Sequence, residues 1–422
     1  VQELVNKGLI LAGHDISAGG LITTLLEMCF ANTEGGMEIN LDKIKCDDIV
    51  KILFAENPGV VIQVADKHKA EVKKILEDAG VGYVKIGVPT EERHILATLH
   101  DATYQFGIDY LRDVWYSTSY LLDRKQSMNG CAKKRFENYK QQPLEFVFDK
   151  SFTGKLSQFG LDPNRRTPSG IKAAIIREKG TNGEREMAYM LYLAGFDVKD
   201  VTMTDLISGR ETLEDINMVV YCGGFSNSDV LGSAKGWAGS FLFNPKAKAA
   251  LDNFYAREDT LSLGVCNGCQ LMMELGLITP EDKKKGKMLH NDSHKFESNF
   301  LGVTVPMNRS VMFGSLSGSK LGIWVAHGEG KFSLPYPEDH YNVVLKYSYD
   351  EYPGNPNGSD YSVAGIASQD GRHLAMMPHL ERACFPWENA YYPLDRKEED
   401  QITPWMEAFV NARKWVEANR KK

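Results

Sequence analysis

The sequence has no long apolar segment, no surplus of basic residues and no even set of cysteines. No apolar run approaches the ~18 residues that a bilayer crossing requires, so a membrane-spanning protein is not expected. The 49 Lys and Arg are outnumbered by 56 Asp and Glu, and the net charge is -7. That balance gives no electrostatic reason to expect nucleic acid or an anionic membrane as a partner. The first residues also lack the basic start and apolar core of a secretion signal.

The seven cysteines are an odd number scattered over 422 residues. This pattern is poor for a disulfide framework and fits a reducing compartment, so we expect a cytoplasmic protein. Hydrophobic residues make up 43% of the chain and charged residues 25%, as in ordinary globular proteins. The length is enough for two or three domains.

The first hundred residues predict a compact α+β unit. Helical apolar spacing predicts helices there, and β-branched content predicts strands. The expected elements are a helix at 20–32, a strand at 59–64, a helix at 66–80 and a strand at 81–89. We therefore expect a β-α-β unit across residues 59–89. Residues 108–169 begin as an amphipathic helix and continue into turn-forming residues, which indicates a connector.

From residue 171 onward, strands and helices alternate. A buried strand is expected at 171–177, followed by a helix at 181–195 with Thr181 or Asn182 as its N-cap and Gly195 as its stop. Apolar strands that alternate with helices predict an α/β fold with a mostly parallel sheet covered on both faces. Ligands bind at the carboxyl ends of the strands in such sheets.

The stretch Gly264-Val265-Cys266-Asn267-Gly268 places a cysteine between two glycines, directly after a strand and directly before a helix. A turn this tight crowds the backbone, and the flanking glycines relieve the crowding. Cys266 would then stand at a helix N-terminus, where the partial positive charge favours the thiolate. The N–H of Asn267 could point at a developing oxyanion. The pattern predicts a nucleophilic cysteine.

The residues alone leave other interpretations of Cys266 and Cys269 open. A thioredoxin-like redox pair usually follows an aromatic residue and lacks the flanking glycines. A zinc site needs more ligands, and the nearby His290 and His294 come without a second cysteine pair. A buried, inert cysteine is the third interpretation. It is what we expect of Cys269, one turn into an apolar helix.

A cysteine nucleophile needs a base, and the base needs an orienting group. The segment 373–382 is interpreted as a short apolar strand followed by a His-x-Glu sequence, His379 to Glu381. Alternate residues of an extended segment face the same side, so Glu381 could reach the His379 ring and fix its tautomer. His373 is expected in a turn and solvated.

Gly223 and Gly224 follow another expected strand. Backbone N–H groups in such a segment are free to face a carbonyl oxygen, although an ordinary glycine-rich turn would have the same sequence. With Cys266 and the His-x-Glu sequence, this makes three candidate segments at the carboxyl ends of strands.

In this order, the three segments resemble those of the class I (triad) glutamine amidotransferases, whose glutaminase domain uses Cys, His and Glu. The stretches "CGGFSNSDVLG", "LGVCNGCQLM", "HGEGKF", "YPGNPNGS" and "MMPHLER" are similar to the glutaminase domain of the large, single-chain phosphoribosylformylglycinamidine synthase family of purine biosynthesis. Upstream, "AGHDISAGG" resembles the last synthetase subdomain of that family. The resemblance covers nearly the whole chain.

The resemblance implies a flavodoxin-like class I glutaminase domain at 170–422, a smaller α+β synthetase subdomain at 1–107 and a connector at 108–169. It implies that glutamine is hydrolysed through a cysteine thioester. The ammonia would serve the ATP-dependent conversion of formylglycinamide ribonucleotide to the amidine. The N-terminal half of the synthetase is missing from this chain and is implied as a partner, whereas nucleic acid and membrane are not.

Carried over to this sequence, the nucleophile is Cys266, the base is His379 and its orienting group is Glu381. Gly224 and Asn267 would supply the oxyanion hole. Two rival hypotheses are another cysteine amide hydrolase or peptidase on the same fold, and a docking fragment without activity of its own.

In "HDISAGG" the family resemblance assigns Asp15 to Mg²⁺ and Ser17 to the nucleotide, ATP or ADP. A carboxylate suits a hard cation, and a hydroxyl beside free N–H groups suits phosphate. An ordinary helix N-cap is the other interpretation of this motif.

The chain departs from the family pattern at three places. It has Asn227-Ser228 where Tyr-Gly is common, Leu380 where a proline separates the His and Glu, and Ala18 where an aspartate is usual. The first change touches the expected glutamine contacts, and the second keeps both catalytic groups.

Overall fold

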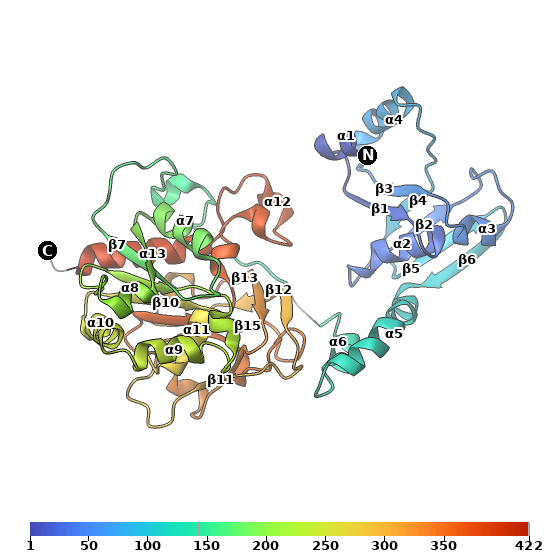
Figure 1. Cartoon of the computed structure of the whole chain (residues 1–422). Helices are drawn as coiled ribbons and strands as arrows, with labels where there is room; N and C mark the ends of the chain where they lie inside the picture. The colour runs from blue at the N-terminus through green and yellow to red at the C-terminus, as the bar shows by residue number, and fades with distance from the viewer. Residues whose placement is uncertain (142–143, 421–422) are drawn as a thin grey trace. The chain divides into compact units, whose positions relative to one another are not determined.

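The computed structural model describes residues 1–141 and 144–420 (Figure 1). Gln142 and Pro143, which fall in the predicted connector, and the last two residues of the predicted C-terminal domain lie outside the described residues. The chain forms two compact units, Val1–Asp123 and Arg124–Lys422. None of the described helices combines the length and the apolar character that a membrane crossing requires.

The first unit contains a four-stranded sheet, a two-stranded sheet and several helices. Its strands are β1 (Ala12–Ile16), β2 (Gly36–Asn40), β3 (Gly59–Gln63), β4 (Gly87–Thr90), β5 (His94–Leu99) and β6 (Ala102–Gly107). Its helices are α1 (Gln2–Asn6), α2 (Gly20–Phe30), α3 (Ile49–Phe54), α4 (Lys69–Asp78) and α5 (Ile108–Gln126), the last of which runs on into the second unit. The predicted helices and the strand at 59–64 are present, whereas the strand expected at 81–89 forms only from Gly87 onward, as β4.

The strand pairing of the first unit differs from the prediction. The larger sheet has the order β4-β2-β5-β6, and β1 pairs antiparallel with β3. The β-α-β unit expected across residues 59–89 is therefore wrong: β3, α4 and β4 form, but β3 and β4 belong to different sheets. Local apolar patterns locate elements, whereas strand partners are fixed by contacts that are distant in sequence.

The second unit is built on one large sheet. Its strands are β7 (Lys172–Arg177), β8 (Asp197–Thr202), β9 (Met218–Tyr221), β10 (Leu261–Val265), β11 (Lys287–Leu289), β12 (Glu297–Thr304), β13 (Lys320–His327), β14 (Lys331–Ser333), β15 (Asn342–Tyr347), β16 (Val363–Ala367) and β17 (His373–Met376). Its helices are α6 (Cys131–Glu137), α7 (Glu184–Ala194), α8 (Met203–Ser208), α9 (Lys235–Leu242), α10 (Pro245–Ala256), α11 (Asn267–Glu274), α12 (Leu394–Lys397) and α13 (Trp405–Asn419).

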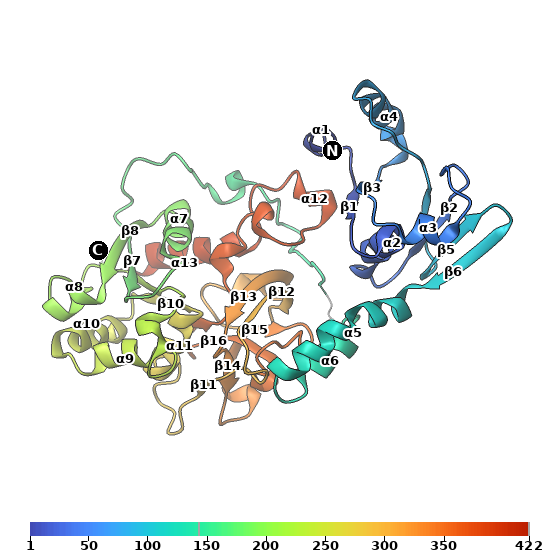
Figure 2. The same cartoon turned by 45° about the vertical axis from the view of Figure 1, so that its right-hand side comes forward.

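The nine-stranded sheet has the order β13-β12-β15-β16-β17-β10-β9-β7-β8. The five strands from β17 to β8 run parallel, and the other four join antiparallel. Helices α7 and α13 pack together on one face, and α8, α9, α10 and α11 form a layer on the other (Figures 1 and 2). Strands β9 and β10 are buried throughout, as a sheet covered on both faces requires. The predicted α/β fold is confirmed, and an antiparallel extension adds to it.

The start of α7 also differs from the prediction. The helix begins at Glu184, and its N-cap is Gly183 with φ of 86°, not Thr181 or Asn182. The N–H of Asn182 instead donates to the carbonyl oxygen of Gly223 at 2.9 Å. The predicted stop at Gly195 is confirmed by its φ of 101°.

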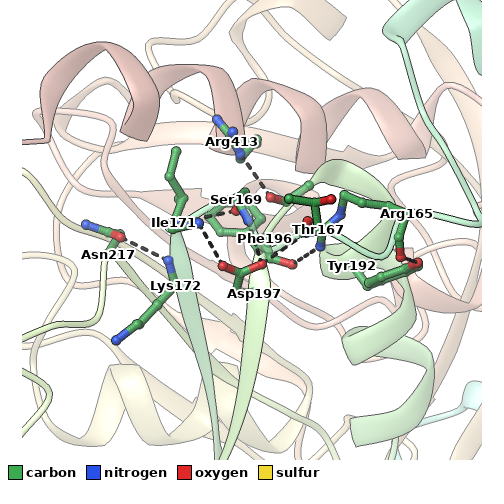
Figure 3. Close-up of polar contacts among 12 residues, drawn as sticks. Arg165, Thr167, Ser169, Ile171, Lys172, Tyr192, Phe196, Asp197, Asn217 and Arg413 are labelled. Carbon is green, nitrogen blue, oxygen red and sulfur yellow. Dashed lines mark hydrogen bonds and ion pairs between the residues drawn. The ribbon is translucent and has the colours of Figure 1, made fainter.

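A polar network fixes the chain where it enters β7 and β8 (Figure 3). The carboxylate of Asp197 accepts hydrogen bonds from the N–H of Ser169 at 3.0 Å, the N–H of Gly170 at 2.8 Å and the guanidinium of Arg165 at 3.0 Å. These contacts lie at the amino ends of the parallel strands. The opposite, carboxyl ends are left for the candidate site.

Candidate active site

Cys266 lies on a sharp turn between β10 and α11. Its φ of 53° is in the left-handed region, where a non-glycine side chain is strained. A Cβ on Gly264 would lie 2.5 Å from the carbonyl oxygen of Gly268, and one on Gly268 would lie 2.0 Å from that of Tyr221. Only glycine fits at either position, so the turn depends on its two flanking glycines.

The thiol of Cys266 is almost enclosed. The residue is 5% exposed, and its Sγ lies 3.5 Å from the carbonyl oxygen of Ala326. Cys269 is completely buried inside α11, and burial raises the pKa of its thiol. The pair therefore consists of one cysteine on the turn and one in the core, as predicted for Cys269.

His379 and Glu381 follow β17 and form a buried pair. Nδ1 of His379 lies 2.7 Å from Oε1 of Glu381, and both side chains are at most 3% exposed. Burial alone would lower the pKa of His379, but the charges of Glu381 and Cys266 and hydrogen bonds to both raise it to about 10. The predicted contact is present, although residues Leu380–Arg382 form a single 3-10 turn instead of an extended segment.

The Cys266 and His379 side chains meet beside Gly223. A Cβ on Gly223 would lie 2.9 Å from Cε1 of His379 and 3.4 Å from the Cβ of Cys266, and Cys266 is among the groups that raise the pKa of His379. Since Nδ1 of His379 is engaged by Glu381, Nε2 is the nitrogen that remains for the thiol. The structure thus brings Cys266, His379 and Glu381 into one cluster at the carboxyl ends of β9, β10 and β17.

Gly224 and Asn267 border the same cluster. Gly224 has φ of 121° and forms an isolated bridge with Thr181, and no acceptor is assigned to its N–H among the described residues. Asn267 is the first residue of α11, so the helix itself offers no acceptor for its N–H. The Asn267 side chain accepts the N–H of Ser226 at 3.1 Å and donates to Gln270 at 2.8 Å. Two backbone donors therefore remain next to the thiol.

The sequence analysis missed a second buried imidazole, His327, at the end of β13. Burial and the charge of His379 lower its pKa to about 3. Its Nδ1 lies 3.2 Å from Oδ1 of Asn291, whose amide nitrogen donates to two carbonyl groups. Nδ1 therefore carries the proton, and Nε2 is a buried acceptor with no partner in the described part of the chain. His327 is the first residue of the "HGEGKF" stretch, which was the sequence feature that could have pointed to it.

His373 is not solvated, which corrects the expectation for this residue. It is 5% exposed, and its Nδ1 lies 3.0 Å from Oγ of Ser262. Burial lowers its pKa to about 4. The expectation was wrong because residue 373 begins β17, which lies between two other strands of the sheet.

Asp15 and Ser17 lie in the first unit, at and just beyond the end of β1. The Asp15 side chain is 71% exposed, and its Oδ1 lies 3.4 Å from Nδ1 of His14. The N-cap of α2 is Gly19, and no side chain caps that helix. The Ser17 hydroxyl is therefore not used in the way that the helix-cap interpretation requires.

In the described part of the chain, the cysteines and histidines form no metal cluster. Within residues 1–141 and 144–420, no three His, Cys, Asp or Glu side chains are grouped so that they could hold a metal ion. All seven cysteines are free. Among the described residues, no further ligand is therefore grouped with Cys266 and Cys269 for zinc.

Comparison with known families identifies the class. The CobB/CobQ-like glutamine amidotransferase domain matches residues 170–416, more than half of the chain. The C-terminal domain of AIR synthase related proteins matches residues 1–100. The chain therefore belongs to the CobB/CobQ-like glutamine amidotransferase family.

Individual relatives narrow the comparison. The probable phosphoribosylformylglycinamidine synthase, chloroplastic/mitochondrial, of Arabidopsis thaliana is 38% identical over 99% of this chain and 31% of that protein. The phosphoribosylformylglycinamidine synthase of Homo sapiens is 38% identical over 98% of this chain and 33% of that protein. The resemblance seen in the motifs is confirmed, and the chain spans about a third of the length of these curated relatives.

A solved structure gives a further comparison. PurLQS from Thermotoga maritima is 27% identical, with a TM-score of 0.45 over 58% of this chain and 99% of that one.

Proposed function

We propose that this chain is the glutamine-hydrolysing part of a phosphoribosylformylglycinamidine synthase, an ATP-dependent ligase that takes its nitrogen from glutamine. The observation that carries the proposal is that Cys266, on its glycine-flanked turn, and His379 both lie against Gly223, with Glu381 bonded to the His379 ring. Family membership and the two synthase relatives support it.

In the proposed reaction, the Cys266 thiolate attacks the side-chain amide carbon of glutamine. The N–H groups of Gly224 and Asn267 stabilise the resulting oxyanion, and one such donor is typically worth about 3 kcal/mol. His379 gives its proton to the departing ammonia, which leaves a glutamyl thioester, and then takes a proton from the water that hydrolyses it. Glu381 orients the imidazole and stabilises its cation.

The charge of Cys266 determines when His379 gives up its proton. The thiolate charge is one of the causes that raise the pKa of His379 to about 10. Attack on glutamine moves that charge from the sulfur to the oxyanion held by Gly224 and Asn267, so the pKa of His379 falls when the leaving ammonia needs the proton. The same group therefore stores the proton in the resting state and releases it in the reaction.

The proposed substrate is a small molecule because the thiol is almost enclosed. A 5% exposed Cys266 suits the side-chain amide of free glutamine better than a polypeptide backbone. A cysteine peptidase on the same fold would need an open groove for its substrate.

The complete synthetase would pass the ammonia to ATP-activated formylglycinamide ribonucleotide. Asp15 and Ser17 provide one carboxylate and one hydroxyl, oxygen donors that suit Mg²⁺ and nucleotide phosphate. A single carboxylate is too few for a site made by protein alone. We therefore propose that phosphates, water and the missing N-terminal half of the synthetase complete it. The seven free cysteines support a cytoplasmic location.

Ammonia and glutamate release from glutamine by the 422-residue chain tests the proposal. We expect the wild type to release both in equal amounts and Cys266→Ala to remain at background, because the thioester cannot form. Thermal unfolding of both proteins controls for folding. Peptide cleavage without glutamine hydrolysis would favour the peptidase. Ammonia release that appears only when the missing half is added would mean that the site is idle in this chain.

A further inference from the structure

The guanidinium of Arg382 lies between Glu381 and the loop that precedes α7. Nη2 of Arg382 donates to Oδ1 of Asn182 at 2.9 Å. Its Nε lies 3.8 Å from Oε1 of Glu381 and 3.8 Å from Oε1 of Glu186, and it has no hydrogen-bond partner among the described residues. One cation therefore faces the buried carboxylate of the proposed triad and a neighbouring loop at once.

Asn182 continues the connection to the segment beside the thiol. Its N–H donates to the carbonyl oxygen of Gly223 at 2.9 Å, and the residue before it forms an isolated bridge with Gly224. A Cβ on Gly223 would touch both His379 and Cys266, so this segment packs directly against the nucleophile and the base. The contacts thus run from Glu381 through the arginine to the segment that offers the Gly224 N–H.

Besides its partner His379, Glu381 has other carboxylates around it. Glu381 is 1% exposed, and its Oε2 has no hydrogen-bond partner among the described residues. Gly183, at the N-terminus of α7, is adjacent, since its Cβ would lie 3.5 Å from Oε1 of Glu381. Glu186 and Glu388 add negative charge, and burial together with the charges of Glu381 and Glu186 raises the pKa of Glu388 to about 7. Arg382 offsets this crowding of carboxylates.

We propose that Arg382 is a positioning residue: it holds Glu381 beside His379 and, through Asn182, holds the Gly223–Gly224 segment against Cys266. The inference rests on the proposed glutaminase function. Beyond that function, one side chain aligns both the base His379 and the Gly223–Gly224 segment. A shift of about 1 Å in either group is enough to slow such chemistry by about 100-fold.

The test uses the 422-residue chain with Arg382→Met, Arg382→Lys and Asn182→Ala. Arg185→Met is the matched control, because it removes an exposed arginine from the first turn of α7, the helix that Arg382 faces. Steady-state ammonia release gives kcat and KM for glutamine. Mass spectrometry of the Cys266 peptide gives its alkylation rate by iodoacetamide at pH 7.5, a readout that needs no glutamine hydrolysis.

We expect Arg382→Met to lower kcat about 10- to 100-fold with KM changed less than threefold, and to slow alkylation at least fivefold. Arg382→Lys keeps a cation near Glu381, so its kcat should be at least fivefold higher than that of Arg382→Met. Asn182→Ala removes the side-chain link to Arg382 and keeps the backbone bond to Gly223. It should therefore lower kcat, by less than Arg382→Met, and leave the alkylation rate unchanged. Arg185→Met should match the wild type in both readouts.

A kcat for Arg382→Met within twofold of wild type, or a loss that Arg185→Met reproduces, overturns the proposal. If Arg382→Met shows no cooperative unfolding, Arg382→Lys and Asn182→Ala test the proposal instead. A wild-type kcat in both of these variants would overturn the proposal. If the wild type itself releases no ammonia, the proposed function fails. The alkylation rates then decide about Arg382, and equal rates in wild type and variant reject its role.

Discussion

His379 connects the proposed chemistry to stability. Its pKa of about 10 in the folded chain lies above the ordinary value of 6.5. Below pH 6.5 the imidazole is charged in both states, and its interaction with Glu381 stabilises the fold fully. As the pH rises from 6.5 to 10, the unfolded chain loses this proton first, so the stabilisation is lost.

We therefore expect the unfolding free energy of the wild type to fall between pH 6.5 and 9.5 more steeply than that of His379→Asn. Urea unfolding at several pH values measures both slopes. His290→Asn, at a histidine whose side chain is 65% exposed, is the control and should keep the wild-type slope. Equal slopes in wild type and His379→Asn would contradict the buried ion pair.

Gly268 makes the nucleophile turn possible. A Cβ there would lie 2.0 Å from the carbonyl oxygen of Tyr221, which is backbone and cannot move aside cheaply. We expect Gly268→Ala to destabilise the second unit by about 3 kcal/mol or more. Gly82→Ala, where a Cβ would meet nothing within 4 Å, is the control. Thermal unfolding checks both, and equal midpoints would reject this account of the turn.

Short-range patterns pointed to the residues of the candidate site but not to their surroundings. Cys266 between two glycines and the His-x-Glu spacing of His379 and Glu381 are local features, so the sequence displays them. The burial of His327 and His373 depends on strands from distant parts of the chain, and no local pattern reports it. The contact of Arg382 with Asn182 joins positions 200 residues apart and was invisible for the same reason.

Among the secondary-structure elements, β8 is fixed at its start by Asp197. Burial raises the pKa of this carboxyl. Hydrogen bonds from Ser169, Arg165 and Gly170 lower the pKa by more than burial raises it, so the net shift is downward. The stabilisation is present above the unfolded pKa and is lost as the pH falls through the folded pKa.

We expect Asp197→Asn to lower the unfolding free energy at pH 7 by about 1.5–3 kcal/mol, because it removes charge-assisted hydrogen bonds. The difference should shrink below pH 4. Asp200→Asn, on the same strand but 60% exposed in its ion pair with Arg177, should cost less than about 1 kcal/mol. Urea unfolding at pH 7 and pH 3.5 measures these values. An equal loss in the two variants would contradict the anchoring role.

Element positions were more predictable than element partners. Apolar periodicity located α2, α4, α5, α7 and α11 and the parallel strands, because burial of one face leaves a local pattern. It placed β3 and β4 in one unit, whereas they pair in different sheets. It also gave no sign that β13, β12, β15 and β16 would extend the parallel sheet antiparallel, since that order depends on long-range contacts.

For the protein as a whole, the chain spans about a third of its synthase relatives. We expect the 422 residues to be unable to complete the ligase reaction. Incubation with formylglycinamide ribonucleotide, ATP, Mg²⁺ and glutamine should release ammonia but neither amidine nor phosphate, because the contacts proposed for Asp15 and Ser17 are too few to form a synthetase site. Phosphate assay and chromatography of the products check this. Amidine formation by this chain alone would show that the synthetase site is complete.

The central claim is that Cys266 acts as a nucleophile on glutamine with His379 beside it. Mass spectrometry after treatment with a chloromethyl ketone analogue of glutamine tests it. We predict one covalent adduct, on Cys266, that free glutamine suppresses and that forms at least tenfold more slowly in His379→Asn. Labelling of Cys269 or of another cysteine instead, or labelling of Cys266 that glutamine does not suppress, would contradict the claim.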